Sequence, residues 1–108
     1  MALLPRWELR FLHAKDGSDP FTAFVSSLSP PAQLEWETLL RLVQQRGDTL
    51  QGSRLVIHTG DVYEFKGDEV RIFYKHVPLH RRILVLGGLR VTDGEDLIQS
   101  ILREAKSV

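Results

Sequence analysis

Hydrophobic residues recur at two different spacings in the first half of the chain. In segment 7–13 apolar and polar residues partly alternate, which is typical of a half-buried strand. In segments 20–28 and 30–46 apolar residues return every three or four positions, which predicts two amphipathic helices. Asp19 before Pro20 fits an N-cap residue followed by a first-turn proline. We expect a helical hairpin packed on a sheet, with these side chains buried: Phe21, Phe24, Trp36 and Leu40.

The second half of the chain predicts strands. Segments 62–66, 69–76 and 82–86 are short and rich in aromatic and β-branched residues. Gly67-Asp68 is a favourable hairpin turn, and Pro78 is typical of a turn between strands. Consecutive hairpins make this part of the sheet antiparallel.

Three further signals complete the expected order. Leu55, Val56 and Ile57 could begin another strand, but polar flanks leave segment 48–59 ambiguous. Gly87-Gly88 is expected to end the third strand, and Thr92-x-x-Glu95 resembles a capping box. Apolar spacing then predicts a helix that ends near Ala105. The predicted class is α+β in the order β-α-α-β-β-β-α, with a mostly antiparallel sheet packed against helices.

Length and composition set the class of protein. The chain has 108 residues, which suits a single domain, here taken as 1–108. It contains no cysteine, which excludes disulfides and thiolate metal sites and fits a cytoplasmic protein. The apolar run at the N-terminus is too short for a signal peptide, and no stretch approaches the roughly 20 apolar residues of a membrane helix. His58, His76 and His80 do not follow a recognised metal-ligand spacing, so we expect neither a metal nor another cofactor.

Charge is unevenly distributed although the formal net charge is zero. Segment 70–92 contains no Asp or Glu. Its basic and imidazole side chains are Arg71, Lys75, Arg81, Arg82 and Arg90, with His76 and His80. One interpretation is a nucleic-acid-binding face, and the other is an ordinary solvent-facing pair of strands.

Three segments together resemble the RelE/ParE toxin superfamily, and its HigB-like, phage-derived branch most. Gly-Asp-Val-Tyr-Glu-Phe-Lys at 60–66 resembles the family's Gly-Leu-Tyr-Glu-Leu-Arg strand. Val-Arg-Ile-Phe-Tyr at 70–74 resembles its Tyr-Arg-Val-hydrophobic-Tyr strand. Ile-Leu-Val-Leu-Gly-Gly-Leu at 83–89 takes the place of its aliphatic strand ending in His-Gly-Phe. The resemblance extends from Trp7 to Ala105.

The resemblance implies the toxin of a type II toxin–antitoxin system that cuts mRNA on the ribosome without a metal. It also implies a cognate antitoxin of the helix-turn-helix type. Such cleavage needs cations near phosphate and groups that move protons. The catalytic candidates are Arg71, Lys66, Tyr74, His76 and Arg82. The candidates for RNA binding are Lys75, His80, Arg81 and Arg90.

A non-enzymatic relative is the alternative, either a gyrase-poisoning protein or a binding module without catalysis. Gly87 and Leu89 stand where the family has histidine and phenylalanine, and the family's lysine pair is missing apart from Arg90. Strand alternation separates Arg71, Phe73 and Lys75 from Val70, Ile72 and Tyr74, and both faces carry apolar residues. The sequence alone therefore does not say which face is open. If an exposed Arg71 stabilises the phosphorane, Arg71→Ala would lower cleavage on the order of 100-fold or more while barely changing stability.

Overall fold

The computed structural model describes residues 7–12, 19–47 and 49–106. Within these residues lie three α-helices, five strands and one 3-10 turn. In chain order they are β1 (Glu8–Phe11), α1 (Pro20–Ser26), α2 (Pro30–Arg46), β2 (Leu55–His58), β3 (Val62–Lys66), β4 (Val70–Val77), η1 (Pro78–His80), β5 (Arg82–Arg90) and α3 (Glu95–Ala105).

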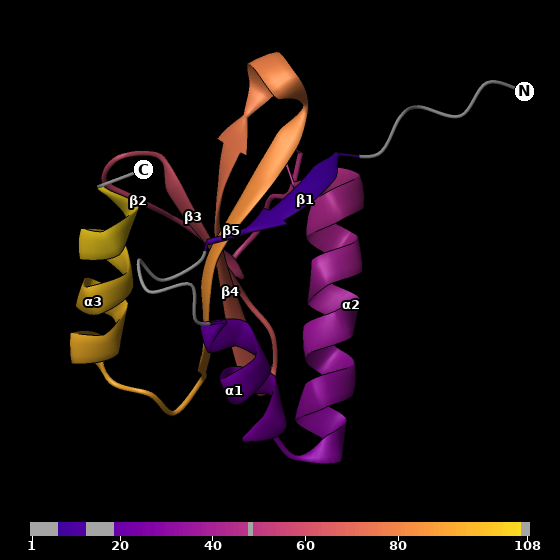
Figure 1. Cartoon of the computed structure of the whole chain (residues 1–108), viewed down its shortest axis with the longest axis vertical. Coiled ribbons are helices and arrows are strands. Elements are labelled where there is room, and N and C mark those ends of the chain that lie inside the picture. Colours follow the sequence, from indigo (N-terminus) through magenta and orange to yellow (C-terminus); the bar gives the residue numbers. More distant parts are fainter. Residues whose placement is uncertain (1–6, 13–18, 48, 107–108) are drawn as a thin grey trace, which may run out of the picture.

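One five-stranded sheet forms the centre of the molecule, with the strand order β1-β5-β4-β3-β2 (Figure 1). The pairs β2–β3, β3–β4 and β4–β5 are antiparallel, and only β1 runs parallel to its neighbour β5. The predicted α+β class and mostly antiparallel sheet are confirmed. The ambiguous segment 48–59 supplies one more strand, β2, which pairs with β3 at an edge of the sheet.

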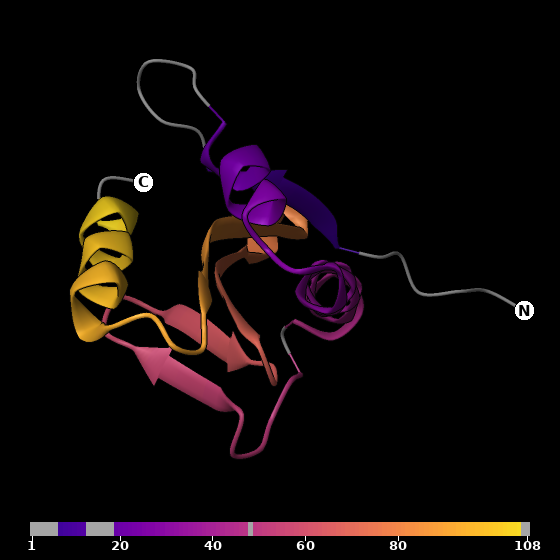
Figure 2. The ribbon, with the colours of Figure 1, turned by 90° about the horizontal axis from the view of Figure 1, so that it is seen from below.

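The helices lie on both faces of the sheet: α1 and α2 cover one face, and α3 covers part of the other (Figures 1 and 2). Local sequence fixes where the first two helices begin. The Asp19 carboxylate accepts the amide hydrogen bonds of Phe21 and Thr22, as predicted, and the Ser29 hydroxyl accepts that of Ala32. Each helix then has proline in its first turn, where a missing N–H costs nothing.

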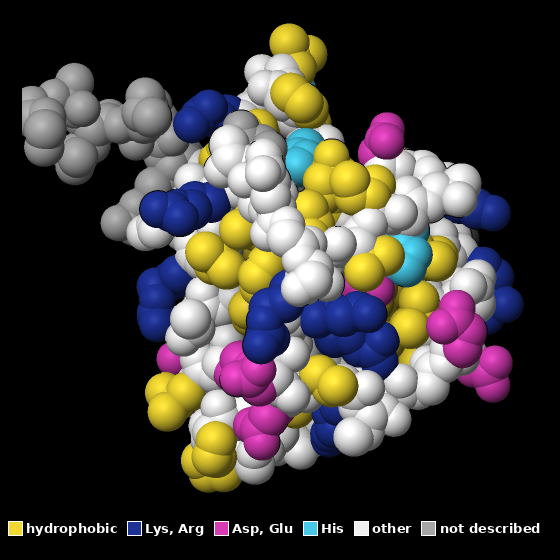
Figure 3. Space-filling view, turned by 180° about the vertical axis from the view of Figure 1, so that it is seen from behind, with side chains coloured by type: hydrophobic (Ala, Val, Ile, Leu, Met, Phe, Trp, Pro, Cys, Tyr) yellow, Lys and Arg dark blue, Asp and Glu magenta, His cyan; other side chains and the backbone are white. Residues whose placement is uncertain are grey.

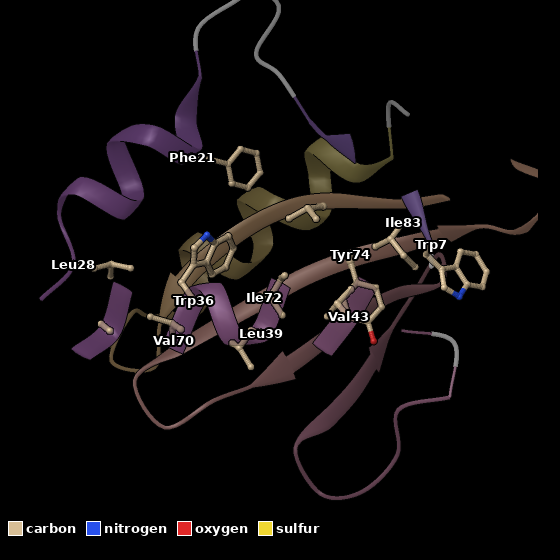
Figure 4. Packing of buried hydrophobic residues seen from close by; sticks show 12 residues of the cluster. Trp7, Phe21, Leu28, Trp36, Leu39, Val43, Val70, Ile72, Tyr74 and Ile83 are labelled. Atoms are coloured by element: carbon tan, nitrogen blue, oxygen red, sulfur yellow. The ribbon is translucent and has the colours of Figure 1, made fainter. Parts of the chain in front are cut away.

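Each face of the sheet has its own hydrophobic cluster. Between the sheet and α1 and α2, Trp36 packs among Phe21, Ile72 and other aromatic and aliphatic side chains (Figure 4). Phe21 and Trp36 are buried as predicted, whereas Phe24 and Leu40 are half-buried. The cluster under α3 is smaller. Its buried members are Val62, Phe73, Leu86, Leu89, Ile98 and Ala105.

Two predicted element ends are wrong. Strand β5 continues through Gly87 and Gly88 to Arg90. A Cβ on Gly88 would lie 2.6 Å from ring atoms of Phe24 and Trp36. Gly88 thus allows two aromatic rings to lie against the strand and does not end it. At α3, the N-cap is Gly94 and no side chain caps the helix, so there is no Thr92–Glu95 capping box. The Asp93 carboxylate instead accepts the amide hydrogen bond of Arg90.

The β3–β4 turn lies one residue later than predicted. The Gly67 amide donates to the Val70 carbonyl, so the hairpin closes around Asp68 and Glu69. Glu35 of α2 explains this position, because its carboxylate accepts the amide hydrogen bonds of both Glu69 and Val70.

Candidate functional site

The nine candidate residues do not form one site, because strand alternation divides them between the two faces of the sheet. Lys66, Arg71 and Lys75 lie on the α3 side. Tyr74, His76 and Arg90 lie on the side of α1 and α2. The remaining three, His80, Arg81 and Arg82, lie around the end of the β4–β5 hairpin, which projects beyond the helices in Figure 1.

The candidates on the α1 and α2 side are engaged in packing or bonding within the protein. Tyr74 is fully buried, and its hydroxyl donates to the Gly47 carbonyl at 3.1 Å. His76 lies among aromatic rings, 4.6 Å from the Tyr63 centroid, and its buried Nε2 has no hydrogen-bond partner among the described residues. Arg90 Nη2 donates to the backbone carbonyl and the hydroxyl of Ser27.

Two of the candidates at the hairpin end, Arg81 and Arg82, contact the N-terminal strand region. The Arg81 guanidinium lies 5.0 Å from the Trp7 ring centroid, in a cation–π arrangement. Arg82 Nε lies 3.4 Å from the Glu8 carboxylate. A hydrogen bond from Arg10, together with the positive charges of Arg10 and Arg82, lowers the pKa of the Glu8 carboxyl. His80 is exposed on the turn.

Arg71 is buried, so the expectation of an exposed strand arginine is wrong. Only 6% of its surface is exposed. Its Nη2 donates to the Asp93 carbonyl at 2.7 Å and to the Arg90 carbonyl at 3.0 Å, and its Nη1 donates to Glu64 at 3.3 Å. The last residue of β5 supplies one of these carbonyls, and the connection from β5 to α3 supplies the other. Arg71 therefore fastens that connection to the sheet, and its removal is expected to lower stability.

Glu64 links Arg71 to a histidine that the sequence did not single out. One carboxylate oxygen, Oε2, faces Arg71, and the other, Oε1, lies 2.7 Å from Nε2 of His58 on β2. Glu64 is 2% exposed, so the carboxylate is shielded from water and is compensated by the guanidinium. The chain Arg71–Glu64–His58 thus crosses three adjacent strands, from the interior of the α3 side to the edge of the sheet.

His58 is held in place on two sides but is open on a third. Its ring stacks on Phe73, with centroids 6.0 Å apart and planes 29° apart. Its side chain is 21% exposed. Unlike Nε2 of His76, Nδ1 of His58 is not a buried nitrogen without a partner. Since Nε2 faces Glu64, Nδ1 is the ring nitrogen left for a substrate.

Cationic side chains lie along the α3 side of β3 and β4, at both ends of the stretch that holds Glu64: Lys66 pairs with Arg71, and Lys75 lies near Val62, the partner of His58. Lys66 follows Glu64 by two positions, so it points to the same face; it is exposed, and no described residue bonds its ammonium group. Arg54, just before β2, donates to the Lys66 carbonyl and to Asp68 at 2.8 Å. Lys75 and Val62 line one small hollow under α3. Figure 3 shows Lys and Arg side chains gathered near the middle of the rear face, with a histidine beside them. Such a surface can attract phosphate and move a proton.

Sequence reasoning missed both Glu64 and His58. A signal for Glu64 was present, because a carboxylate in the middle of the otherwise apolar strand 62–66 needs a partner. His58 lies in the segment that stayed ambiguous, so neither its strand nor its face could be assigned.

Two general searches of the described part of the chain gave negative results. No group of three or more His, Asp or Glu side chains among those residues is arranged to hold a metal ion. None of the described helices combines the length and apolar character needed to cross a membrane.

Comparison with known proteins identifies the fold. No protein-family model matches the sequence, and no curated protein matches it. Among solved structures, the chain is similar to the isolated RelE toxin of E. coli, with a TM-score of 0.56 at 14% sequence identity. The match covers 90% of this chain and 97% of that chain. The chain therefore has a RelE-like fold over almost its whole length, in agreement with the resemblance of its strand motifs.

Proposed function

We propose that this protein is the toxin of a type II toxin–antitoxin system and acts as an endoribonuclease on mRNA. The observation that carries the proposal is the RelE-like fold with a cationic α3-side surface around His58 and Lys66. Cleavage on the ribosome, independence from metal and a cytoplasmic location belong to the same proposal. The strand motifs at 60–66 and 70–74 favour the HigB-like, phage-derived branch.

The reaction requires little from the protein beyond charge and proton transfer. The 2′-hydroxyl of the RNA attacks the adjacent phosphorus, and negative charge develops on the phosphorane oxygens. A lysine close to those oxygens lowers the barrier, and the exposed Lys66 is the catalytic candidate best placed to do so. Lys75 would support binding of the backbone, and the exposed His80 and Arg81 on the projecting hairpin could contact RNA farther away.

Expression from a tightly repressed promoter tests the proposal. Induction should arrest growth within minutes and produce new 5′ ends within mRNA, mapped by primer extension. The purified protein should cut mRNA on ribosomes equally well with and without a metal chelator. Lys66→Gln should slow cleavage at least 10-fold, whereas Gln45→Ala, on the exposed side of α2, should cut like the wild type. Intact mRNA in arrested cells would contradict the proposal.

The second candidate is a non-enzymatic RelE-like protein, and the engagement of Arg71 favours it. The guanidinium is bonded to Glu64 and to backbone carbonyls, so it is not available to hold a phosphate in this conformation. Growth arrest with intact mRNA and with inhibited supercoiling of plasmid DNA would identify gyrase poisoning. Binding to RNA without cleavage and without arrest would identify a binding module.

An antitoxin is the expected partner. Its gene should lie beside the toxin gene and encode a small protein with a helix-turn-helix pattern. Co-expression should restore growth and yield a stable complex in which the toxin cuts no mRNA. A neighbouring product that neither binds the chain nor restores growth would count against the toxin assignment.

A further inference from the structure

We infer that His58, oriented by the buried Glu64, is the general base of this protein. The inference rests on the proposed RNA cleavage. It assigns proton transfer to a histidine outside the basic segment 70–92, in place of His76 and His80. Two features are needed in a base of this kind: a ring nitrogen that can reach the substrate, and a partner that fixes the ring and its tautomer.

Among the described histidines, His58 has both features. The Glu64 carboxylate holds Nε2 at 2.7 Å, and the Phe73 ring stacks on one side of the imidazole, so the ring is fixed in position and plane. In the tautomer that carries its proton on Nε2, the ring donates to Glu64 and leaves the lone pair of Nδ1 for a substrate proton. This is the arrangement in which a carboxylate orients an imidazole for proton abstraction.

The other described candidates lack one feature each. His76 has its Nε2 buried among aromatic rings without a partner. His80 is exposed, but no described carboxylate is within bonding distance to orient it. Tyr74 is completely buried, and its hydroxyl is directed at the Gly47 carbonyl. Only His58 on the edge strand β2 combines an accessible ring nitrogen with an orienting carboxylate, and the candidates of the basic segment 70–92 do not.

Arg71 acts in this site through Glu64 and not through the substrate. It compensates the buried carboxylate from the side opposite His58, so that the carboxylate remains in place without water. Arg71 and Glu64 are thus positioning residues. This role agrees with a guanidinium whose other donors are taken by the carbonyls before α3.

The step balances as follows. Nδ1 of His58 takes the proton of the 2′-hydroxyl, and the oxygen electron pair forms the new bond to phosphorus. The bond between phosphorus and the 5′-oxygen breaks with its electron pair, and the leaving 5′-oxygen takes a proton from water. The products are a 2′,3′-cyclic phosphate and a 5′-hydroxyl, and the imidazolium returns its proton to solvent. Lys66, on the same face as Glu64, would lie near the phosphorane oxygens.

Single-turnover cleavage by the purified full chain on ribosomes with a short mRNA, followed from about pH 5 to pH 9, tests the inference. His58→Gln should lower the rate constant on the order of 100-fold or more at saturating substrate, with little change in substrate affinity. It should also lose the acid limb of the wild-type pH profile. The control Gln45→Ala should retain the wild-type rate and profile, since that side chain is exposed on α2, away from the proposed site.

Two further measurements separate the possible failures. If the wild type cuts no RNA, the proposed function fails; if the wild type cuts and a folded His58→Gln cuts equally well with the same profile, only the base assignment fails. An RNA with a 5′-bridging sulfur has a leaving group that needs no proton, and His58→Gln should stay slow on it. Rescue on that substrate would make His58 the acid and overturn the assignment.

A variant that does not fold is covered by a measurement on the wild type. Binding of an uncleavable RNA with a 2′-O-methyl group at the cleavage position should shift the imidazole signals of His58 in NMR spectra more than those of His76, which lies among aromatic rings on the other face of the sheet. Unchanged His58 signals at saturation would also overturn the assignment.

Discussion

The two faces of the sheet bury their residues in different ways. On the α1 and α2 side, the interior is made of rings and aliphatic chains, and Nε2 of His76 is a buried side-chain nitrogen without a hydrogen-bond partner among the described residues. On the α3 side, a shorter helix covers a smaller cluster, and a chain of three charged or titratable groups extends from it to the edge of the sheet. We expect the larger cluster under α1 and α2 to contribute more to stability. The α3 side is only partly covered, so its polar side chains are accessible to a substrate.

The largest loss of stability is expected from the apolar face. Trp36 is 3% exposed, and its ring lies 5.2 Å from that of Phe24. Trp36→Ala should lower the free energy of unfolding by about 4 kcal/mol, because it removes a large buried side chain and leaves a cavity. Leu34→Ala, on the exposed side of the same helix, should stay within about 0.5 kcal/mol. Urea denaturation measures both, and equal losses would mean that α2 does not face the sheet through Trp36.

On the α3 side the largest effect is expected from the buried ion pair. Arg71→Ala leaves Glu64 without its guanidinium and should cost about 3 kcal/mol, because a buried charge loses its partner. Arg54→Ala breaks the exposed pair with Asp68 and should cost less than about 1 kcal/mol.

A double variant tests whether the loss arises from the pair itself. Glu64→Leu with Arg71→Met replaces both charges by apolar groups and should be more stable than Arg71→Ala alone. Thermal melts of the wild type, Arg71→Ala, Arg54→Ala and the double variant give the comparison. An Arg71→Ala protein as stable as the wild type would contradict the buried ion pair and would mean that Arg71 is exposed.

The two faces also differ in how much of them could be predicted from the sequence. The helices follow from local information, since the N-caps Asp19 and Ser29 and the apolar spacing lie within each segment. The end of β5 does not, because the role of Gly88 depends on aromatic rings of α1 and α2. Strand β2 is ambiguous in the sequence for the same reason: its flanks are polar, and the pairing with β3 that stabilises it is not local.

The candidate site was harder to predict than the fold. A run of basic residues on adjacent strands looks continuous in the sequence, but alternation sends Arg71 and Tyr74 to opposite faces. The group that we propose as the base comes from another strand, and it meets its carboxylate only through the pairing of β2 with β3. Among the predicted catalytic residues, only Lys66 is exposed on the same face of the sheet as Glu64.

The adjacent glycines of β5 allow a direct comparison of the two faces. A Cβ on Gly88 would lie 2.6 Å from the rings of Phe24 and Trp36, whereas a Cβ on Gly87 would lie 2.9 Å from the flexible end of Ile101 on α3. Gly88→Ala should therefore lower the free energy of unfolding by about 2 kcal/mol, and Gly87→Ala by less than about 1 kcal/mol, since Ile101 can change its rotamer. Urea denaturation again gives the values, and the reverse order would show that α3 is the more tightly packed side.

The smallest effect is expected at the opposite edge of the sheet, where Glu8 is exposed. Leu9 and Phe11 of β1 pack toward α1 and α2, so Glu8 and Arg10 point to the α3 side, as Glu64 does.

The hydrogen bond from Arg10, with the charges of Arg10 and Arg82, lowers the pKa of Glu8 in the folded protein. A lowered pKa stabilises the fold above the pKa of the unfolded chain, about 4.3, and this stabilisation disappears as the pH falls through the folded value. Glu8→Gln should thus be slightly less stable than the wild type at about pH 6, and this difference should be smaller at about pH 3; salt should reduce the difference at the higher pH. Thermal melts at both pH values check this, and a loss in Glu8→Gln as large as that in Arg71→Ala would mean that exposure does not separate the two edges of this face.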